Sequence, residues 1–423
     1  MRITISGARV IDPASRLDQI TDIHIDGGLI RALGKAPEGF VAAQTIDARG
    51  LIAGPGLVDL NVSLREPGFG RKGNIASETR AATAGGVTSL CSPPDSNPVL
   101  DTPAVAELIL DRSERAGQTR VFPIGALTKN LEGEQLSELV ALRDAGCVAF
   151  TQGLAPVKNN RILRRALEYA AGFDLPIIFT PLDPELAEGG VAHEGPTAAR
   201  LGLRGIPETA ETVALARDLL LIEQTGVRAH FSGLSSARAI DMLADAQARG
   251  LPVTADVAMY QLLLCDEDLD SYSSLFHVMP PLRSSSDRRT LRQAVQSGVI
   301  QAIASHHQPH ESEAKRVPFA ASAAGISSVE ILLPLALTLV ADGLLELPAL
   351  LARLTHGPAT ALRLPTGRIT AGDSADLVLF DPAGTTDIGK PWLSRGNNCP
   401  FIGQSAPGRV SHTLCQGRLV YQA

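Results

Sequence analysis

Cysteine is scarce in this sequence, and its spacing excludes the structures that cysteines most often build. The five cysteines are Cys91, Cys147, Cys265, Cys399 and Cys415, and no two of them stand in C-x-x-C spacing. That spacing argues against a zinc ribbon, and the odd, scattered set argues against a disulfide framework. We interpret all five as small buried apolar residues in a reducing compartment.

Other absences exclude whole classes of partner. Aromatic residues make up only 4% of the chain, so an aromatic platform for stacking bases or sugars is not expected. The net charge is −7 and no basic run occurs, which argues against nucleic acid as the main partner. No apolar stretch reaches membrane-spanning length, and no secretory signal pattern follows Met1. We therefore expect a soluble, cytoplasmic protein that binds neither nucleic acid nor membrane.

The middle of the chain shows a repeated alternation of strand and helix patterns. Short apolar runs, beginning with residues 56–62 and ending with residues 299–305, are separated by amphipathic helical segments. Strands separated by helices predict right-handed crossovers and a parallel sheet, hence an α/β fold. About eight such units over roughly 300 residues favour a closed (β/α)8 TIM-type barrel over an open sheet.

The two ends of the chain show strand patterns instead of the strand–helix alternation of the middle. Residues 3–10 and 20–25 near the start, and 374–380 and 410–421 near the end, all carry strand signals. We predict that residues 1–53 and 366–423 together build one small β domain. Residues 54–365 then form the barrel, inserted between the two halves of that domain.

Several sequence blocks resemble one known family. Residues 54–68, GPGLVDLNVSLREPG, resemble the first barrel strand of dihydroorotases in the amidohydrolase superfamily, which reads GLVDxHxHLREPG. Further blocks follow in the family's order, among them PDSNPV at 94–99, HFSGLSS at 230–236 and ASHHQPH at 304–310. The resemblance covers essentially the whole chain, and so many blocks in order make it a specific one.

In that family, zinc makes a hydroxide-like nucleophile by lowering the pKa of bound water to about 7. The family's H-x-H pair suits a strand, because residues i and i+2 point to the same face. Here every position that the resemblance assigns to a metal ligand or bridging group holds a different residue. These former ligand positions are Asn61, Ser63, Gln152, Gly153, Thr180, Gly233 and His306. The resemblance therefore implies no metal, no other cofactor and no catalytic residue.

The positions around the substrate carboxylate are only partly kept. Arg65 and His310 match the family residues that face this carboxylate, and a guanidinium suits a planar anion. Asp95 and Met279 stand where the family has asparagines. An aspartate repels an anion and a methionine cannot donate a hydrogen bond. We therefore interpret Arg65, Asp95, Met279 and His310 as a vestigial substrate pocket.

The segment ASHHQPH is the only concentration of histidines. We interpret His306, His307 and His310 as one inherited pocket histidine with two structural neighbours rather than as a new metal site, because no carboxylate or cysteine with ligand spacing accompanies them. Arg65 equally suits a structural ion pair with Glu66 or Asp95.

Three hypotheses for function remain. The chain resembles the inactive dihydroorotase homologue that associates with bacterial aspartate transcarbamoylase, which implies a scaffold or assembly subunit in pyrimidine biosynthesis. Its partner is then the aspartate transcarbamoylase catalytic chain, and we expect a homo-oligomer. The first alternative is an amidohydrolase with altered or metal-free chemistry, using the three histidines with Asp95 or Asp59. The second is a sensor that binds a pyrimidine intermediate through Arg65 and His310.

Overall fold

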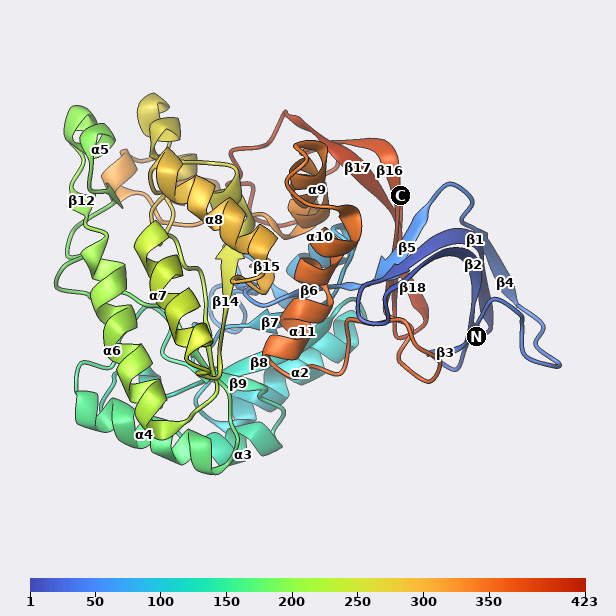
Figure 1. The fold of residues 1–423 in the computed structure, drawn as a ribbon, viewed down its shortest axis with the longest axis horizontal. Coiled ribbons are helices and arrows are strands. Elements are labelled where there is room, and N and C mark those ends of the chain that lie inside the picture. Colours follow the sequence, from blue (N-terminus) through green and yellow to red (C-terminus); the bar gives the residue numbers. More distant parts are fainter.

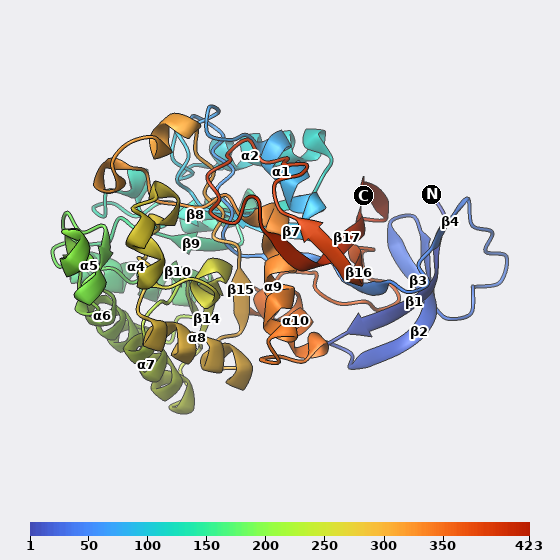
Figure 2. The ribbon, with the colours of Figure 1, turned by 90° about the horizontal axis from the view of Figure 1, so that it is seen from above.

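The computed structural model describes residues 1–423 and contains a barrel with a separate sheet at its side (Figures 1 and 2). Eight parallel strands form the barrel, with each strand hydrogen-bonded to the next in chain order. They are β6 (Leu57–Asp59), β7 (Val87–Ser92), β8 (Arg120–Ala126), β9 (Ala149–Thr151), β10 (Ile177–Phe179), β13 (Ala229–Phe231), β14 (Val253–Ala258) and β15 (Ala302–Ala304). The predicted (β/α)8 barrel is confirmed.

The barrel closes just beyond its first and last strands. Val62 forms a parallel bridge with His307, the amide of Ser63 donates to the His307 carbonyl at 2.9 Å, and the amide of His307 donates to the Asn61 carbonyl at 3.1 Å. The seam therefore lies at residues that follow β6 and β15, where strand ends form the mouth of the barrel.

Helices cover the barrel, and a buried cluster fills its interior. The main helices are α1 (Ile75–Ala84), α2 (Pro103–Ala116), α3 (Leu139–Asp144), α4 (Asn160–Gly172), α6 (Thr209–Thr225), α7 (Ala237–Ala248), α8 (Ser285–Ser297), α9 (Leu332–Ala341) and α10 (Leu347–Leu354). A short excursion between β10 and α6 holds β11 (Ala192–His193), α5 (Pro196–Leu201) and β12 (Gly205–Ile206). Inward strand residues such as Val58, Ile124 and Ile178 pack with Ala359 and Leu362 at α11 (His356–Ala361).

The two ends of the chain meet in one sheet, in the order β18-β17-β16-β5-β1-β2-β3, with β4 also paired to β1. Its strands are β1 (Ile3–Asp12), β2 (Leu17–Asp26), β3 (Leu29–Leu33), β4 (Gln44–Asp47), β5 (Ile52–Pro55), β16 (Leu377–Asp387), β17 (Ser405–Cys415) and β18 (Arg418–Gln422). The tail stretch 410–421, which carries strand signals in the sequence, belongs to a hairpin of β17 and β18 that turns at Gln416 and Gly417, whose φ angles are 51° and 69°. The bounds predicted for the two domains stay a prediction.

Between β16 and β17, residues 388–404 leave the sheet and run to the barrel; we call this segment the strap. Its Asn398 accepts a hydrogen bond from the His310 amide and donates to the carbonyls of Gln308 and Gly325. The strap thereby ties the terminal sheet to the loops that follow β15. No helix of the molecule is long and apolar enough to cross a membrane.

Candidate functional site

A cavity of about 280 Å³ opens at the mouth of the barrel. Six of the seven former ligand positions line it, because the carboxyl ends of parallel barrel strands meet at one face. The lining residues from the sequence prediction are Asn61, Ser63, Asp95, Gln152, Gly153, Thr180, Met279 and His306. The structure therefore brings these eight positions together at one cavity, whereas the roles that the sequence assigns to them stay a prediction.

Asn61 and Ser63 follow β6 and point neutral polar groups into the site. The Asn61 Nδ2 atom lies 3.3 Å from His306 Nδ1 and 3.5 Å from Ser232 Oγ. The Ser63 hydroxyl donates to Asp95 at 3.5 Å. Amide and hydroxyl oxygens are weak zinc ligands compared with imidazole, so this pair does not replace an H-x-H pair.

His306 is held at the centre of the site by an acid that sequence reasoning missed. Its Nε2 lies 2.7 Å from Asp256 Oδ1, and the other carboxylate oxygen of Asp256 lies 3.0 Å from His230 Nε2. Burial raises the pKa of Asp256, but attraction to His306 and the contact with His230 outweigh it and hold that pKa well below its usual range. The backbone at His306 is left-handed, with φ of 48°, so the surrounding bonds keep it in an unfavourable conformation.

Gly233 does not line the cavity but lies directly against His306. A Cβ atom at position 233 would stand 2.8 Å from His306 Cε1, and the Gly233 amide donates to Asp256 at 2.8 Å. The imidazole of His306 thus needs the space that any side chain at 233 would take. The glycine at position 233 and the histidine at position 306, both at former ligand positions, are therefore sterically linked.

The remaining former ligand positions carry no charge. Gln152 accepts a hydrogen bond from Thr128 at 2.8 Å, and Gly153 and Thr180 add only a backbone segment and a hydroxyl. No group of three or more His, Cys, Asp or Glu side chains in the molecule is arranged to hold a metal ion. With both His306 nitrogens engaged by Asp256 and Asn61, the residues present do not fit a zinc site of the family's kind.

Arg65 and His310 lie beside the cavity rather than in its lining. The Arg65 guanidinium donates to the Pro309 carbonyl at 3.2 Å and to Asp95 at 3.4 Å, and its Nη2 lies 3.3 Å from His310 Nε2. Burial and the charge of Arg65 lower the pKa of His310 to about 3, so His310 is neutral. The expected ion pair of Arg65 therefore forms with Asp95, whereas Glu66 pairs with Arg112.

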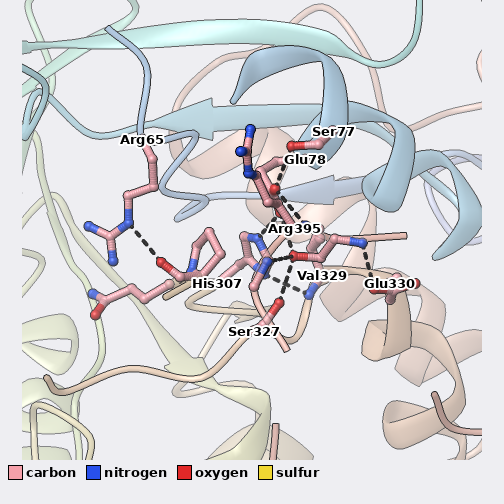
Figure 3. A network of polar contacts seen from close by, with 12 residues as sticks. Arg65, Ser77, Glu78, His307, Ser327, Val329, Glu330 and Arg395 are labelled. Carbon is pink, nitrogen blue, oxygen red and sulfur yellow. Dashed lines mark hydrogen bonds and ion pairs between the residues drawn. The ribbon is translucent and has the colours of Figure 1, made fainter. Parts of the chain in front are cut away.

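His307 has polar partners of its own, among them Glu78 (Figure 3). Its Nδ1 accepts the amide of Ser328 at 2.9 Å, so its Nε2 carries the proton and donates to Glu78 at 2.8 Å. The three histidines have separate partners and do not converge on one point. Asp59 is also engaged: it is fully buried, accepts the amides of Ser305 and Asn61, and its pKa is raised by burial.

Comparison with known proteins agrees with this geometry. The family model described as "Dihydro-orotase-like" matches residues 50–239. A "Dihydroorotase-like protein" of Pseudomonas aeruginosa is 68% identical over 422 residues and covers 100% of both chains. A "Dihydroorotase" of Anaeromyxobacter sp. (strain K) is 42% identical, covering 99% of this chain and 97% of the relative. This chain belongs to the dihydroorotase-like family.

Solved structures extend the similarity of the dihydroorotase-like chain at the level of fold. An L-hydantoinase (dihydropyrimidinase) from Arthrobacter aurescens superposes with a TM-score of 0.87, at 22% identity, over 99% of this chain and 96% of that one. A D-hydantoinase gives a TM-score of 0.83, also at 22% identity, over 100% and 95%. The barrel with its sheet of terminal strands is therefore a fold that the chain shares with these hydantoinases.

Two buried acids of this dihydroorotase-like chain were not found from the sequence. Asp256 lies in the apolar run VTADVA of β14, and Glu78 lies in α1 with its side chain fully buried. An acidic residue in an apolar strand is rarely buried unless it is paired. The position of Asp256 in this run could therefore have indicated a buried acid with a partner. Glu78 had no such signal, because its partners Ser394 and Arg395 stand more than 300 residues away along the chain.

Proposed function

We propose that this chain is a non-catalytic dihydroorotase homologue that acts as an assembly subunit for aspartate transcarbamoylase. One observation carries the non-catalytic part. Of the former ligand positions, only His306 holds a residue with real metal affinity, and its two nitrogens are already engaged by Asp256 and Asn61. Opening or closing a cyclic amide at neutral pH needs an activated water, and this donor set offers no means to activate one through zinc.

The rest of the cavity supplies no obvious substitute for a zinc ion that activates a water. Asp59 is fully buried and does not line the cavity; its Oδ1 accepts two backbone amides, and its Oδ2 has no hydrogen-bond partner. Asp95 lines the cavity and is engaged by Arg65 and Ser63. His310 is neutral and lies outside the cavity lining. A general base must reach the proton that it removes; of the ionisable side chains only His306 and Asp95 line the cavity, and each is already engaged by groups of the chain itself.

The assembly role is supported by what the chain has kept. The barrel, the terminal sheet and the strap are complete, although the residues of the reactive site are replaced. The named partner follows from the resemblance to inactive dihydroorotase homologues that associate with aspartate transcarbamoylase. A barrel of this size has ample surface for an interface of the standard 1,600 Å² class, by order of magnitude.

The assembly proposal is tested by purifying the aspartate transcarbamoylase catalytic chain of the same organism alone and with this chain. Sedimentation velocity should show one larger particle only in the mixture, and transcarbamoylase activity should be higher in that particle. A His306→Gln variant serves as a control, because the assembly should tolerate a change inside the cavity. Two independent species with unchanged transcarbamoylase activity would contradict the proposal.

A metal-free amidohydrolase is the second candidate, and the Asp256–His306 contact at 2.7 Å is the observation in its favour. A carboxylate that orients an imidazole is the usual way to prepare a general base. A dihydroorotase assay with and without added zinc separates the two proposals. We expect no turnover in either condition; turnover that His306→Gln and Asp256→Asn both abolish would move this candidate to first place.

A further inference from the structure

The outward side of α6 is apolar, although this helix lies on the surface of the barrel. Val213 and Leu220 are 49% and 66% exposed, and Ala216 between them lies on the same side of the helix, at spacings of three and four residues. The inward side of α6 is apolar too, with Leu215 and Leu219 buried. A surface helix usually turns polar residues to the solvent, whereas a helix that is apolar on both sides is usually covered. The outward side of α6 thus has the composition of a buried surface.

Exposed apolar residues also occur on the helices on either side of α6. The order of the strands places α6 between α4 and α7, and it packs against both (Figure 1). At the end of α4, Tyr169 and Phe173 are 38% and 48% exposed, and their ring centroids lie 5.0 Å apart. Between α6 and α7 runs a groove of about 870 Å³, lined by Leu220 and Met242 among others. We call the outer surface of α4, α6 and α7 the three-helix face.

The two flanks of the three-helix face carry opposite charge. On the α4 flank, residues 158–172 carry four cations and one acid, and of these cations only Arg164 is paired within the chain, with Glu168 at 2.9 Å. The four cations are Lys158, Arg161, Arg164 and Arg165. The groove at the α7 flank is lined by four acids and two arginines, of which Arg249 is already paired with Glu223 at 3.1 Å and Asp245 at 3.2 Å. The four acids are Glu208, Asp241, Asp245 and Asp287.

A face with one positive and one negative flank is complementary to itself. A two-fold axis that runs along α6 turns a second copy so that its α4 flank meets the α7 flank of the first, and the reverse contact forms at the same time. The same rotation brings the two α6 helices together, so that Val213 and Leu220 leave water in both copies. An axis perpendicular to α6 would instead set α4 against α4, with like charges opposed. The charges therefore select one of the two arrangements.

We propose that the three-helix face is the contact surface of a homodimer, with α6 of each chain beside the two-fold axis. The outward residues of α6 supply the apolar area that is removed from water. The pairing of the α4 flank with the α7 flank of the other copy fixes the orientation. The proposal concerns the chain alone and goes beyond an assembly with aspartate transcarbamoylase.

Sedimentation velocity of the purified full chain at a series of concentrations tests the role of α6. We expect the unchanged chain to sediment at twice the mass of one chain at micromolar concentration. Leu220→Glu should raise the dissociation constant at least about thirtyfold, because it places a carboxylate in an apolar contact. Ile20→Glu, at a 77% exposed apolar position of β2, is the matched control and should leave the dissociation constant unchanged. Thermal unfolding shows whether each variant is folded.

Reversal of charge on the two flanks tests the orientation of the dimer. Arg165→Glu and Asp241→Arg should each weaken the dimer about tenfold, because each change acts twice across a two-fold axis. The double variant exchanges the two charges between the flanks, and its dissociation constant should return to within about threefold of that of the unchanged chain.

Three results would overturn the proposal of a homodimer at this face. The first is an unchanged chain that stays monomeric at about 100 µM, far above the range of a specific dimer. The second is a dimer that a folded Leu220→Glu leaves as tight as before; if that variant also fails to bind the aspartate transcarbamoylase catalytic chain, the face belongs to that partner. The third is a double charge variant that dimerises as weakly as either single variant.

Discussion

His306 and Gly233 share one small volume at the mouth of the barrel, and the effect of each on the other can be measured. Gly233 has φ of +73°, and an added Cβ would meet His306 Cε1 at 2.8 Å. Gly233→Ala should therefore destabilise the fold by about 2–4 kcal/mol, from backbone strain and overpacking together. Chemical denaturation measures this change in the free energy of unfolding.

Gly202 provides a matched control for that substitution. Its φ is +66°, but no atom lies within 4 Å of an added Cβ, so Gly202→Ala should cost only the backbone term of about 1 kcal/mol. In a His306→Ala background, Gly233→Ala should fall to the same small cost. Equal costs for Gly233→Ala with and without the imidazole would show that the steric linkage is wrong.

At the scale of elements, the strap is the part whose attachment should respond to pH. Glu330 accepts the amides of Leu393 and Ser394 at 3.0 and 3.1 Å, and burial raises its pKa to about 7. Glu78, beneath the same segment, accepts the Ser394 hydroxyl at 2.6 Å and the Arg395 amide at 3.1 Å. Figure 3 labels both acids, with Glu78 near Arg395 and Glu330 on the far side of Val329.

The sign of the pH effect follows from the raised pKa of Glu330. Between about pH 4.5 and 7 the folded chain holds a proton that the unfolded chain has released, so this residue makes stability fall as pH rises. The loss is complete above pH 7 and is at most about 3 kcal/mol. Glu330→Gln should remove this contribution, so the stability of the wild type minus that of the variant should fall as pH rises from 4.5 to 7, measured by urea denaturation at several pH values.

Glu346→Gln, at an exposed position just before α10, is the control for Glu330→Gln and should leave the pH profile unchanged. Amide exchange at Leu393 and Ser394 gives a second reading, because it reports opening of the strap itself. The wild-type slope alone does not decide, because the buried neutral His310 acts in the opposite sense over this pH range. Parallel pH profiles for the wild type and Glu330→Gln between pH 4.5 and 7 would contradict the assignment.

The elements differ in how well the sequence predicts them. The barrel strands follow from apolar runs between helical patterns, and the site residues follow from their places at strand ends, where chain order alone brings them together. The hairpin at Gln416 and Gly417 was missed because it depends on two positive φ angles rather than on hydrophobic period. The strap's attachment to Glu78 and Glu330 was missed because it joins segments distant in sequence, and no local pattern records such a contact.

For the whole molecule, one ion pair joins the barrel to the terminal sheet. Arg120 at the start of β8 donates to Asp376 at 2.6 Å, and Asp376 also accepts the amide of Gln416. The Asp376 side chain is 4% exposed. Arg120→Met should therefore leave a buried, uncompensated carboxylate and destabilise the protein by about 3–5 kcal/mol.

A surface ion pair gives the matched comparison. Arg115→Met removes the partner of Asp111 at the end of α2, where the Arg115 side chain is 78% exposed, and should cost less than about 1 kcal/mol. Differential scanning calorimetry of the two variants measures both effects. A melting temperature for Arg120→Met equal to that of Arg115→Met would show that the junction contributes little.

The strap also has a consequence for how the protein is made. The ribosome releases the chain from residue 1 onward, yet β5 pairs with β16, and the buried carboxylate of Glu78 receives its hydroxyl and amide donors from residues 394 and 395. Until nearly the whole message has been translated, the emerging chain carries an unfinished sheet edge and an acid without part of its partners. Such an intermediate exposes strand edges that pair readily with other chains, so a truncated or stalled product is expected to depend on chaperones far more than the finished protein does.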